Sequence, residues 1–250
     1  MELKMCKINM VTIGVIILFS FCTPCAASFS SHNDFGPDVP ERTFIFHNSI
    51  RDLQEFRRYA EIAASLKSYG NVLVDIGVLA EKSPVHQLDF RSGWHDYGTY
   101  MATMWAFFPH PKLASHLPMQ WVINNRNLLL GKVEILDKFG LNAVFSANET
   151  QFLPESFFRE NPHLRGPRVD APHRTTRAEF AWCTDQPETL EMIEWMVYEL
   201  RRNAPQIKEF HSWNNDSGSG ICWLNSLYSG ANGPSFCRHS QERSSNKTKK

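Results

Sequence analysis

Short apolar segments alternate with amphipathic segments along this chain, and this alternation restricts its possible folds more than any other feature. The apolar segments, each followed by turn or polar residues, are residues 43–47, 71–78, 141–146 and 207–213. Apolar residues at helical spacing, each run closed by glycine or proline, occupy residues 49–70, 120–139 and 185–203. Strands that alternate with helices in this way predict a parallel sheet with right-handed crossovers.

The connections after the second and third predicted strands are much longer than ordinary turns. The first runs from about residue 79 to residue 119, and the second is interrupted by Pro154, Pro162, Pro167 and Pro172. Enlarged loops after parallel strands are typical of a TIM-like (β/α) barrel, in which such loops build the active site. Only about four of the eight repeats of a full barrel are present. Residues 43–239 therefore form either an incomplete barrel, which we favour, or a small complete α/β fold.

The N-terminal residues have the pattern of a secretory signal peptide. Lys4 and Lys7 precede an apolar run over residues 11–21, and Ala26 and Ala27 end the segment with small side chains. We expect cleavage after residue 27, a polar linker over residues 28–42, and a secreted or periplasmic protein. A retained membrane anchor and a lipoprotein anchor at Cys22 are the less favoured alternatives.

Composition excludes some classes of function. Lys plus Arg and Asp plus Glu number 26 each, so the chain has no net charge to attract nucleic acid. We expect no nucleic-acid partner, no metal and no cofactor, since no zinc pattern or phosphate-binding loop is present. An apolar content of 42% is sufficient for a core, whereas the charged residues 240–250 have no packing pattern and are expected to be disordered. Export permits a disulfide, but the sequence does not choose a pair among Cys183, Cys222 and Cys237.

Two carboxylates follow the third and fourth predicted strands. Glu149 comes after the third strand, and Asp216 lies in a polar, glycine-rich run after the fourth. The carboxyl ends of parallel strands meet at one edge of a sheet, so both acids are expected at the same rim. Glycoside cleavage uses such a pair, one as general acid and one as nucleophile or base. Asn148 and Asn215, each directly before one of these acids, are candidates to bind a sugar hydroxyl. The alternative is that both acids belong to ordinary turns.

Aromatic and basic residues near the predicted rim supply candidate sugar contacts. The indole rings of Trp94, Trp105, Trp213 and Trp223 can stack on the apolar face of a sugar, although packing of the loops is the alternative for each. Arg165 and Arg168 lie in a basic segment that could bind the carboxylate or sulfate of an anionic sugar. Their alternative role is to form ion pairs with Glu160 and Asp170 that stiffen the loop.

Three segments resemble motifs of secreted bacterial (β/α)-barrel proteins related to glycoside hydrolases. They are Phe145-Ser146-Ala147-Asn148-Glu149-Thr150-Gln151-Phe152-Leu153-Pro154-Glu155, Pro162-His163-Leu164-Arg165-Gly166-Pro167-Arg168-Val169-Asp170 and Asn215-Asp216-Ser217-Gly218-Ser219-Gly220-Ile221-Cys222-Trp223. The resemblance spans roughly residues 43–239 and implies a barrel that processes carbohydrate. The His-x-Gly-Gly-Asp-Glu signature of family 20 hexosaminidases is absent, so no residue role is transferred from that family.

The sequence therefore predicts a secreted glycoside hydrolase whose partner is a carbohydrate, with membrane contact only through the signal segment. Glu149 and Asp216 are the predicted catalytic pair. The competing interpretation is a non-catalytic carbohydrate-binding protein, or an inactive fragment of such an enzyme.

Overall fold

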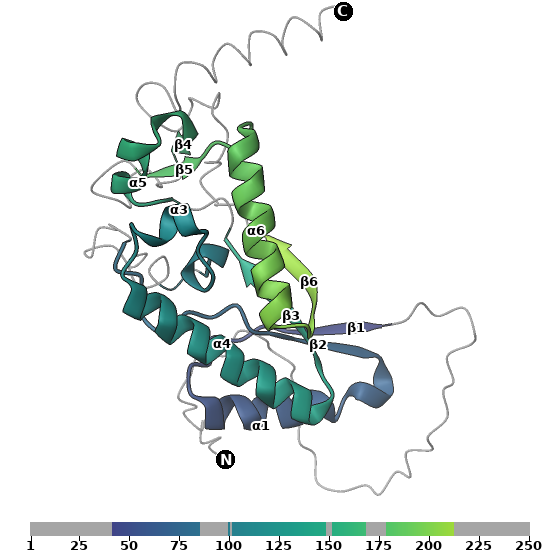
Figure 1. Cartoon of the computed structure of the whole chain (residues 1–250). Helices are drawn as coiled ribbons and strands as arrows, with labels where there is room; N and C mark the ends of the chain where they lie inside the picture. Colours follow the sequence, from purple (N-terminus) through teal and green to yellow (C-terminus); the bar gives the residue numbers. More distant parts are fainter. Residues whose placement is uncertain (1–41, 86–99, 101, 149–151, 169–178, 213–250) are drawn as a thin grey trace, which may run out of the picture. The chain divides into compact units, whose positions relative to one another are not determined.

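A parallel four-stranded sheet is the centre of the fold. The structure, a computed structural model, describes residues 42–85, 100, 102–148, 152–168 and 179–212. The sheet has the strand order β1-β2-β3-β6, and each neighbouring pair is parallel. Its strands are β1 (Thr43–Phe46), β2 (Asn71–Asp75), β3 (Asn142–Ala147) and β6 (Ile207–Ser212). The four predicted strands and their parallel pairing are thus confirmed, and the domain is an α/β fold (Figure 1).

Three long helices connect consecutive strands of the sheet. They are α1 (Leu53–Ala64), α4 (Met119–Phe139) and α6 (Pro187–Asn203). The predicted glycine stop of the middle helix is confirmed, because Gly140 adopts the left-handed conformation with φ 58°. The first helix begins later than predicted. Its N-cap is Asp52, whose side chain accepts a hydrogen bond from the Glu55 N–H, and it ends before the short 3-10 turn η1 (Lys67–Tyr69).

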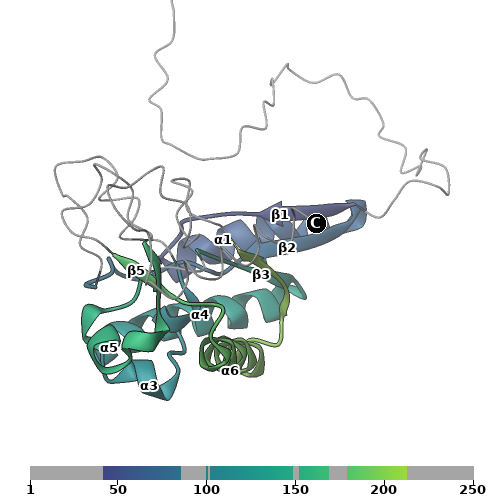
Figure 2. The same cartoon turned by 90° about the horizontal axis from the view of Figure 1, so that it is seen from above.

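The three helices pack on one face of the sheet and form the main core with it. Alternate residues of β2 and β3, among them Val74 and Phe145, belong to the same buried cluster as Phe56 of α1, Leu129 of α4 and Leu200 of α6. Figure 2 shows α4 and α6 together on one side of the strands. Consecutive strands in sequential order, joined by right-handed crossovers, place their helices on a common face. The opposite face of the sheet is therefore not covered by these three helices.

The buried stripe of α6 differs from the predicted one. Thr189, Met192, Met196 and Leu200 face the core, whereas Leu190, expected on that stripe, is 53% exposed. Consecutive residues lie about 100° apart around a helix axis, so Leu190 points away from the core face that Thr189 occupies. The helix begins after Gln186, one residue later than the capping acid Asp185 suggested.

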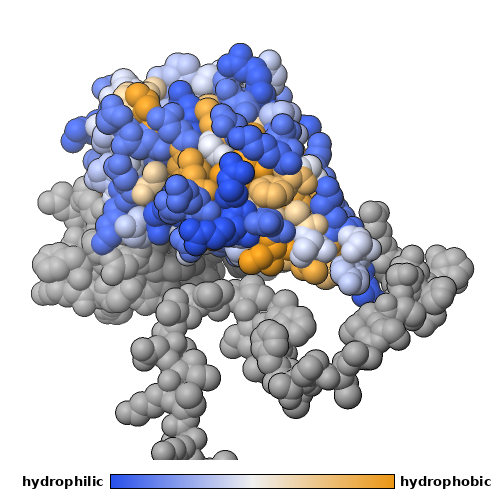
Figure 3. All heavy atoms as spheres, turned by 90° about the horizontal axis from the view of Figure 1, so that it is seen from below, coloured by the Kyte–Doolittle hydropathy of each residue, from blue (hydrophilic) through white to orange (hydrophobic). Residues whose placement is uncertain are grey.

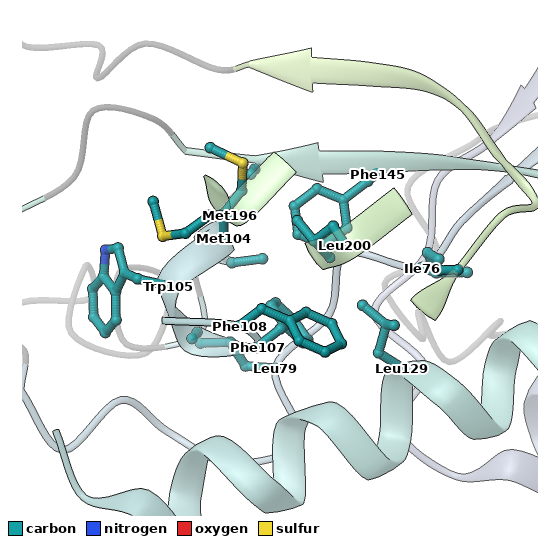
Figure 4. Close-up of a cluster of buried hydrophobic side chains, with 14 of the residues drawn as sticks. Ile76, Leu79, Met104, Trp105, Phe107, Phe108, Leu129, Phe145, Met196 and Leu200 are labelled. Carbon is teal, nitrogen blue, oxygen red and sulfur yellow. The ribbon is translucent and has the colours of Figure 1, made fainter. Parts of the chain in front are cut away.

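The first long connection contributes to the core instead of forming only a surface loop. It contains the 3-10 turn η2 (Met104–Ala106) and the short helix α3 (Pro111–Ala114). The next two residues after η2, Phe107 and Phe108, belong to the same buried cluster as Phe145 of β3 and Leu129 of α4 (Figure 4). The rings of Phe107 and Phe145 meet edge to face, with centroids 5.5 Å apart.

Asn125 of α4 holds this connection to the rest of the domain. Its side chain is fully buried, its Oδ1 accepts from the Ala80 N–H at 2.8 Å, and its Nδ2 donates to the Ala106 carbonyl at 3.3 Å. One side chain therefore satisfies backbone groups at the start and in the middle of the connection.

Asn125→Ala is expected to lower the free energy of unfolding by about 2 kcal/mol, because it leaves two backbone polar groups without these partners in a buried position. Asn124→Ala is the matched control, since Asn124 is only partly buried and its side chain bonds to the exposed residues Gln120 and Glu81. We expect the control to change stability by less than about 1 kcal/mol. Urea denaturation of the two variants measures the difference, and equal losses would show that Asn125 has no special role.

The second long connection folds into a small subdomain. It contains α5 (Glu155–Glu160), the 3-10 turn η3 (Pro162–Leu164) and a two-stranded antiparallel sheet of β4 (Arg165–Arg168) and β5 (Phe180–Trp182). Phe152 forms an isolated bridge with Ala181. The sequence, with its four prolines, predicted only a long loop here.

Hydrophilic atoms separate the hydrophobic ones over the face of the molecule shown in Figure 3. Ile62 of α1 and Tyr198 of α6, each 62% exposed, are among the largest exposed apolar side chains of the described residues. Scattered exposed apolar residues are normal for a protein surface.

Candidate functional site

The sheet face that lies opposite the helices carries polar side chains near the carboxyl ends of its strands. Side chains alternate between the faces of a strand, so residues two apart share a face. On β2 and β3, Leu73 and Val144 occupy this second face and are fully buried, and Asp75 and Ser146 follow them toward the carboxyl ends. By the same alternation, His47 after β1 and His211 on β6 belong to this face. Polar residues from four strands are thus gathered where parallel α/β sheets bind ligands.

Asp75 is the most firmly held residue of this group. Its side chain is only 7% exposed, and its Oδ1 accepts hydrogen bonds from the backbone N–H groups of Gly77 at 2.9 Å and Ser146 at 3.2 Å. The other carboxylate oxygen, Oδ2, lies 3.1 Å from Nδ1 of His47. These bonds link the ends of β1, β2 and β3 through a single carboxylate and fix its position.

His47 presents its ring to solvent while Asp75 holds one edge of it. The His47 side chain is 41% exposed, and its backbone carbonyl accepts a hydrogen bond from the Tyr59 hydroxyl of α1 at 2.9 Å. The hydrogen bond that Asp75 accepts from the ring, together with the charge of that carboxylate, raises the pKa of His47 above its usual 6.5, although burial opposes this shift. The Asp75 pair therefore favours the protonated ring and restrains its orientation.

A buried lysine lies beneath the same strand ends. Lys132 of α4 is fully buried; its Nζ is 3.4 Å from Oδ1 of Asn48 and 4.7 Å from the centre of the Phe56 ring. Asn48 in turn donates to the Asp75 carbonyl at 2.8 Å. Burial lowers the pKa of Lys132 to about 7, and Arg51 adds to this, while the negative charge of Asp75 acts in the opposite direction. Lys132 is sealed in the interior, so we assign it a structural position.

The lowered pKa of Lys132 predicts a dependence of stability on pH. The unfolded chain binds this proton up to the ordinary pKa of 10.5, whereas the folded chain releases it near 7. The unfolded state therefore holds more protons between these values, and the free energy of unfolding rises with pH, by about 2 kcal/mol between pH 7 and pH 9. In Lys132→Met this part of the rise is expected to disappear, and the variant is expected to be more stable than the parent at pH 7.

Chemical denaturation of the parent chain and of Lys132→Met at several pH values measures this effect. Lys138→Met, at an exposed site in the last turn of α4, is the control and should keep the pH dependence of the parent. If the parent and Lys132→Met show the same slope with pH, Lys132 is not the source of the dependence.

His211 and Glu209 bring a second imidazole to this face from β6. Nε2 of His211 lies 3.0 Å from Oε2 of Glu209, two residues away on the same strand. The rings of His211 and His47 have centroids 5.9 Å apart. Their strands are three positions apart in the sheet, which corresponds to about 14 Å in a flat sheet. The two side chains therefore converge over the strands that separate them.

The structure describes two of the predicted binding residues. Asn148 directly follows β3, is partly buried, and donates its backbone N–H to the Ala102 carbonyl at 2.8 Å. Arg165 forms an ion pair with Glu155, and its guanidinium lies over the rings of Phe158 and Phe180, 5.0 and 4.7 Å from their centroids. These contacts lie within the small subdomain, and the ion-pair partner of Arg165 is Glu155, which was not among the predicted partners. A role of Arg165 in binding an anionic sugar stays a prediction.

The other predicted site residues fall outside what the structure describes. They are Glu149, Asp216, Trp94, Trp213, Asn215, Trp223 and the side chain of Arg168. The strands that lead to the two predicted catalytic acids are described, however. Ala147 of β3 and Ser212 of β6 are partners in register, so the strands before Glu149 and Asp216 end side by side.

Sequence reasoning missed His47 and Asp75 as site candidates. The segment Val72-Leu73-Val74-Asp75-Ile76 contains one acid within a buried apolar run. An ionised group in such a place requires hydrogen-bond partners, so Asp75 could have been singled out from the sequence. The pairing with His47, 28 residues earlier, depends on β1 lying beside β2 and has no local signal.

Comparisons of the chain with protein-family models, with curated proteins and with solved structures found no match. Within residues 42–85, 100, 102–148, 152–168 and 179–212, no group of three or more His, Cys, Asp or Glu side chains is placed to hold a metal ion. Over the same residues, no helix is both long and apolar enough to span a membrane. Cys183, in the same part of the chain, is buried.

Proposed function

We propose that this chain is a secreted, glycoside hydrolase-like protein that binds glycans at the carboxyl ends of its parallel strands. Glu149 and Asp216 are the proposed catalytic pair, one protonating the glycosidic oxygen and the other acting as nucleophile or base. The observation that supports this proposal best is the register of Ala147 with Ser212, because it brings the ends of the two strands that precede these acids together.

The form of the sheet also supports a barrel-like arrangement. Strand order follows the chain order, and all neighbouring pairs are parallel, as in consecutive repeats of a (β/α) barrel. The convergence of His47 and His211 over the middle strands is expected on the concave face of a curved sheet. We propose that the domain is an incomplete barrel in which this concave face corresponds to the interior.

Several side chains on the rim suit a ligand rich in hydroxyl groups. His47, His211 and Glu209 offer donors and acceptors on a partly exposed face, with side chains 41%, 27% and 44% exposed. Asn148 follows β3 at the same rim, and the predicted indole contacts would supply an apolar face for a sugar ring.

The alternative function is carbohydrate binding without catalysis. The four strands of the described sheet are half of a complete barrel, in which catalytic groups come from the ends of several different strands. A chain with half of these strands could retain ligand contacts and lack an essential catalytic group.

A glycan panel tests the proposal. The full chain, without its signal segment, is incubated with neutral and uronic or sulfated oligosaccharides, and both release of reducing ends and binding by calorimetry are measured. We expect binding and hydrolysis of at least one glycan. Binding without hydrolysis would favour the alternative function, and absence of both would contradict the proposal.

A further inference from the structure

We propose that His47, held in place by Asp75, contacts a neutral hydroxyl-bearing part of the ligand, with His211 as the second imidazole of the same subsite. This inference rests on the proposed glycan-binding function and names the residues and the ligand chemistry of one part of that site. Neither imidazole was among the site residues that the sequence analysis predicted.

Asp75 and His47 have different roles in this subsite. The Asp75 carboxylate is 7% exposed and is occupied by the N–H groups of Gly77 and Ser146 and by the His47 ring. It is therefore placed to orient another residue instead of touching a ligand. The His47 ring, 41% exposed, is the part of the pair that a ligand can reach. Asp75 is thus a positioning residue for His47.

Two imidazole rings from strands on opposite edges of the sheet converge in this subsite. His47 comes from the end of β1 and His211 from β6, yet their ring centroids are 5.9 Å apart. Each ring is fixed through one nitrogen by a carboxylate, Asp75 for His47 and Glu209 for His211. The bond to a carboxylate sets the orientation in which each ring meets a ligand. Two oriented rings at this spacing suit neighbouring hydroxyl groups of one sugar.

The balance of charge in the subsite determines which class of ligand it favours. Each imidazole of the pair is accompanied by a carboxylate, so the subsite has no excess of positive charge to attract an anion. The Glu209 side chain is 44% exposed and would repel a ligand carboxylate or sulfate. Hydroxyl groups can both donate to carboxylates and accept from imidazoles. The subsite therefore favours a neutral part of a sugar.

The titratable groups around His47 come from three elements. Asp75 of β2 bonds to its ring, Tyr59 of α1 bonds to its carbonyl, and His211 with Glu209 faces it from β6. The charges of Asp75 and of Arg51, in the loop before α1, both act on Lys132 of α4. Any change in ligand binding with pH must be interpreted with all of these groups in view.

Histidine NMR signals combined with calorimetry test the inference on the full chain. We would titrate neutral oligosaccharides from the glycan panel into the parent chain, His47→Gln, Asp75→Asn and a control, His110→Gln. His110 precedes α3, accepts a hydrogen bond from the Lys112 N–H, and its ring packs against Trp195 of α6, one of the helices on the other face of the sheet. We expect the signals of His47 and His211 to shift during the titration. We expect His47→Gln to weaken binding about tenfold and His110→Gln to leave it unchanged.

Asp75→Asn separates a positioning role from a purely structural one. In this variant the pKa of His47 should fall toward 6.5, because the charged hydrogen-bond partner is lost, and glycan affinity should fall with it while the variant stays folded. An unchanged NMR titration curve of His47 in folded Asp75→Asn would overturn the positioning role.

The outcomes also separate this inference from the proposed function. If a glycan is bound or hydrolysed while the His47 signals do not move and His47→Gln binds normally, the subsite is wrong and the proposed function stands. If the His47 and His211 signals shift with a glycan that is never hydrolysed, the subsite is supported and the hydrolase proposal fails. If no glycan binds, both are overturned.

Discussion

Gly77→Ala is expected to destabilise the domain by roughly 3 kcal/mol or more, the largest loss of stability we expect from a single methyl group. A Cβ atom at residue 77 would lie 2.2 Å from the backbone carbonyl oxygen of Ser146. Backbone of the neighbouring strand cannot rotate away as a side chain can, so β2 and β3 would have to separate. This movement would also disturb the hydrogen bonds that Asp75 accepts from Gly77 and Ser146.

Gly131→Ala is the matched control for this substitution. A Cβ atom there would meet the end of the Leu53 side chain at 2.7 Å, and that side chain can move. Residue 131 lies inside α4, where alanine is favoured over glycine by about 1 kcal/mol, so we expect a nearly neutral result. Urea denaturation with far-UV circular dichroism measures both variants. A Gly77→Ala protein as stable as Gly131→Ala would show that the ends of β2 and β3 are not packed as described.

Glu149→Gln and Asp216→Asn are each expected to lower the rate of glycan hydrolysis by about a thousandfold, which corresponds to roughly 4 kcal/mol of transition-state stabilisation. The amides keep the size of each side chain and remove its ability to transfer a proton or to act as a nucleophile. Binding of the glycan should change little, since the loss concerns the transition state.

Glu191→Gln and Asp185→Asn are the controls for these two substitutions. Both acids are exposed, Glu191 on α6 and Asp185 just before it, and neither belongs to the proposed site. Initial rates and calorimetric affinities are measured for all four variants on a glycan that the parent chain hydrolyses. Full activity in Glu149→Gln or in Asp216→Asn would remove that residue from the proposed catalytic pair.

The elements with strong periodicity could be predicted from the sequence. Residues 120–139 were predicted as a helix closed by Gly140, and α4 spans Met119–Phe139 with Gly140 in the left-handed conformation. β1, β3 and β6 were predicted to within one residue at each end, because apolar runs bounded by turn residues mark buried parallel strands clearly. β2 ends at Asp75, three residues before its predicted end. Helix starts were less accurate. Ser49 and Asp52 both suit an N-cap, and only the structure shows that Asp52 accepts the capping bond.

The long connections could not be predicted because their structure depends on tertiary contacts. Phe107 and Phe108 lie in a stretch without helical or strand period, and their burial depends on the space between β3 and α4. Trp105, considered as a sugar contact or as packing, is 2% exposed and packs against Trp121 and Phe152.

One part of the candidate site could be predicted from the sequence and another part could not. The prediction that the strands before Glu149 and Asp216 end at a common edge followed from the parallel order of the strands and is confirmed. The pair of His47 and Asp75 could not be predicted, because it requires the partner of each strand to be known.

The most direct test of the account is a crystal structure of the Glu149→Gln, Asp216→Asn double variant with a bound oligosaccharide. We predict that the sugar lies at the carboxyl ends of β3 and β6, within reach of both replaced side chains and in contact with His47 or His211. A glycan bound on the helical face, or at the opposite ends of the strands, would contradict the account.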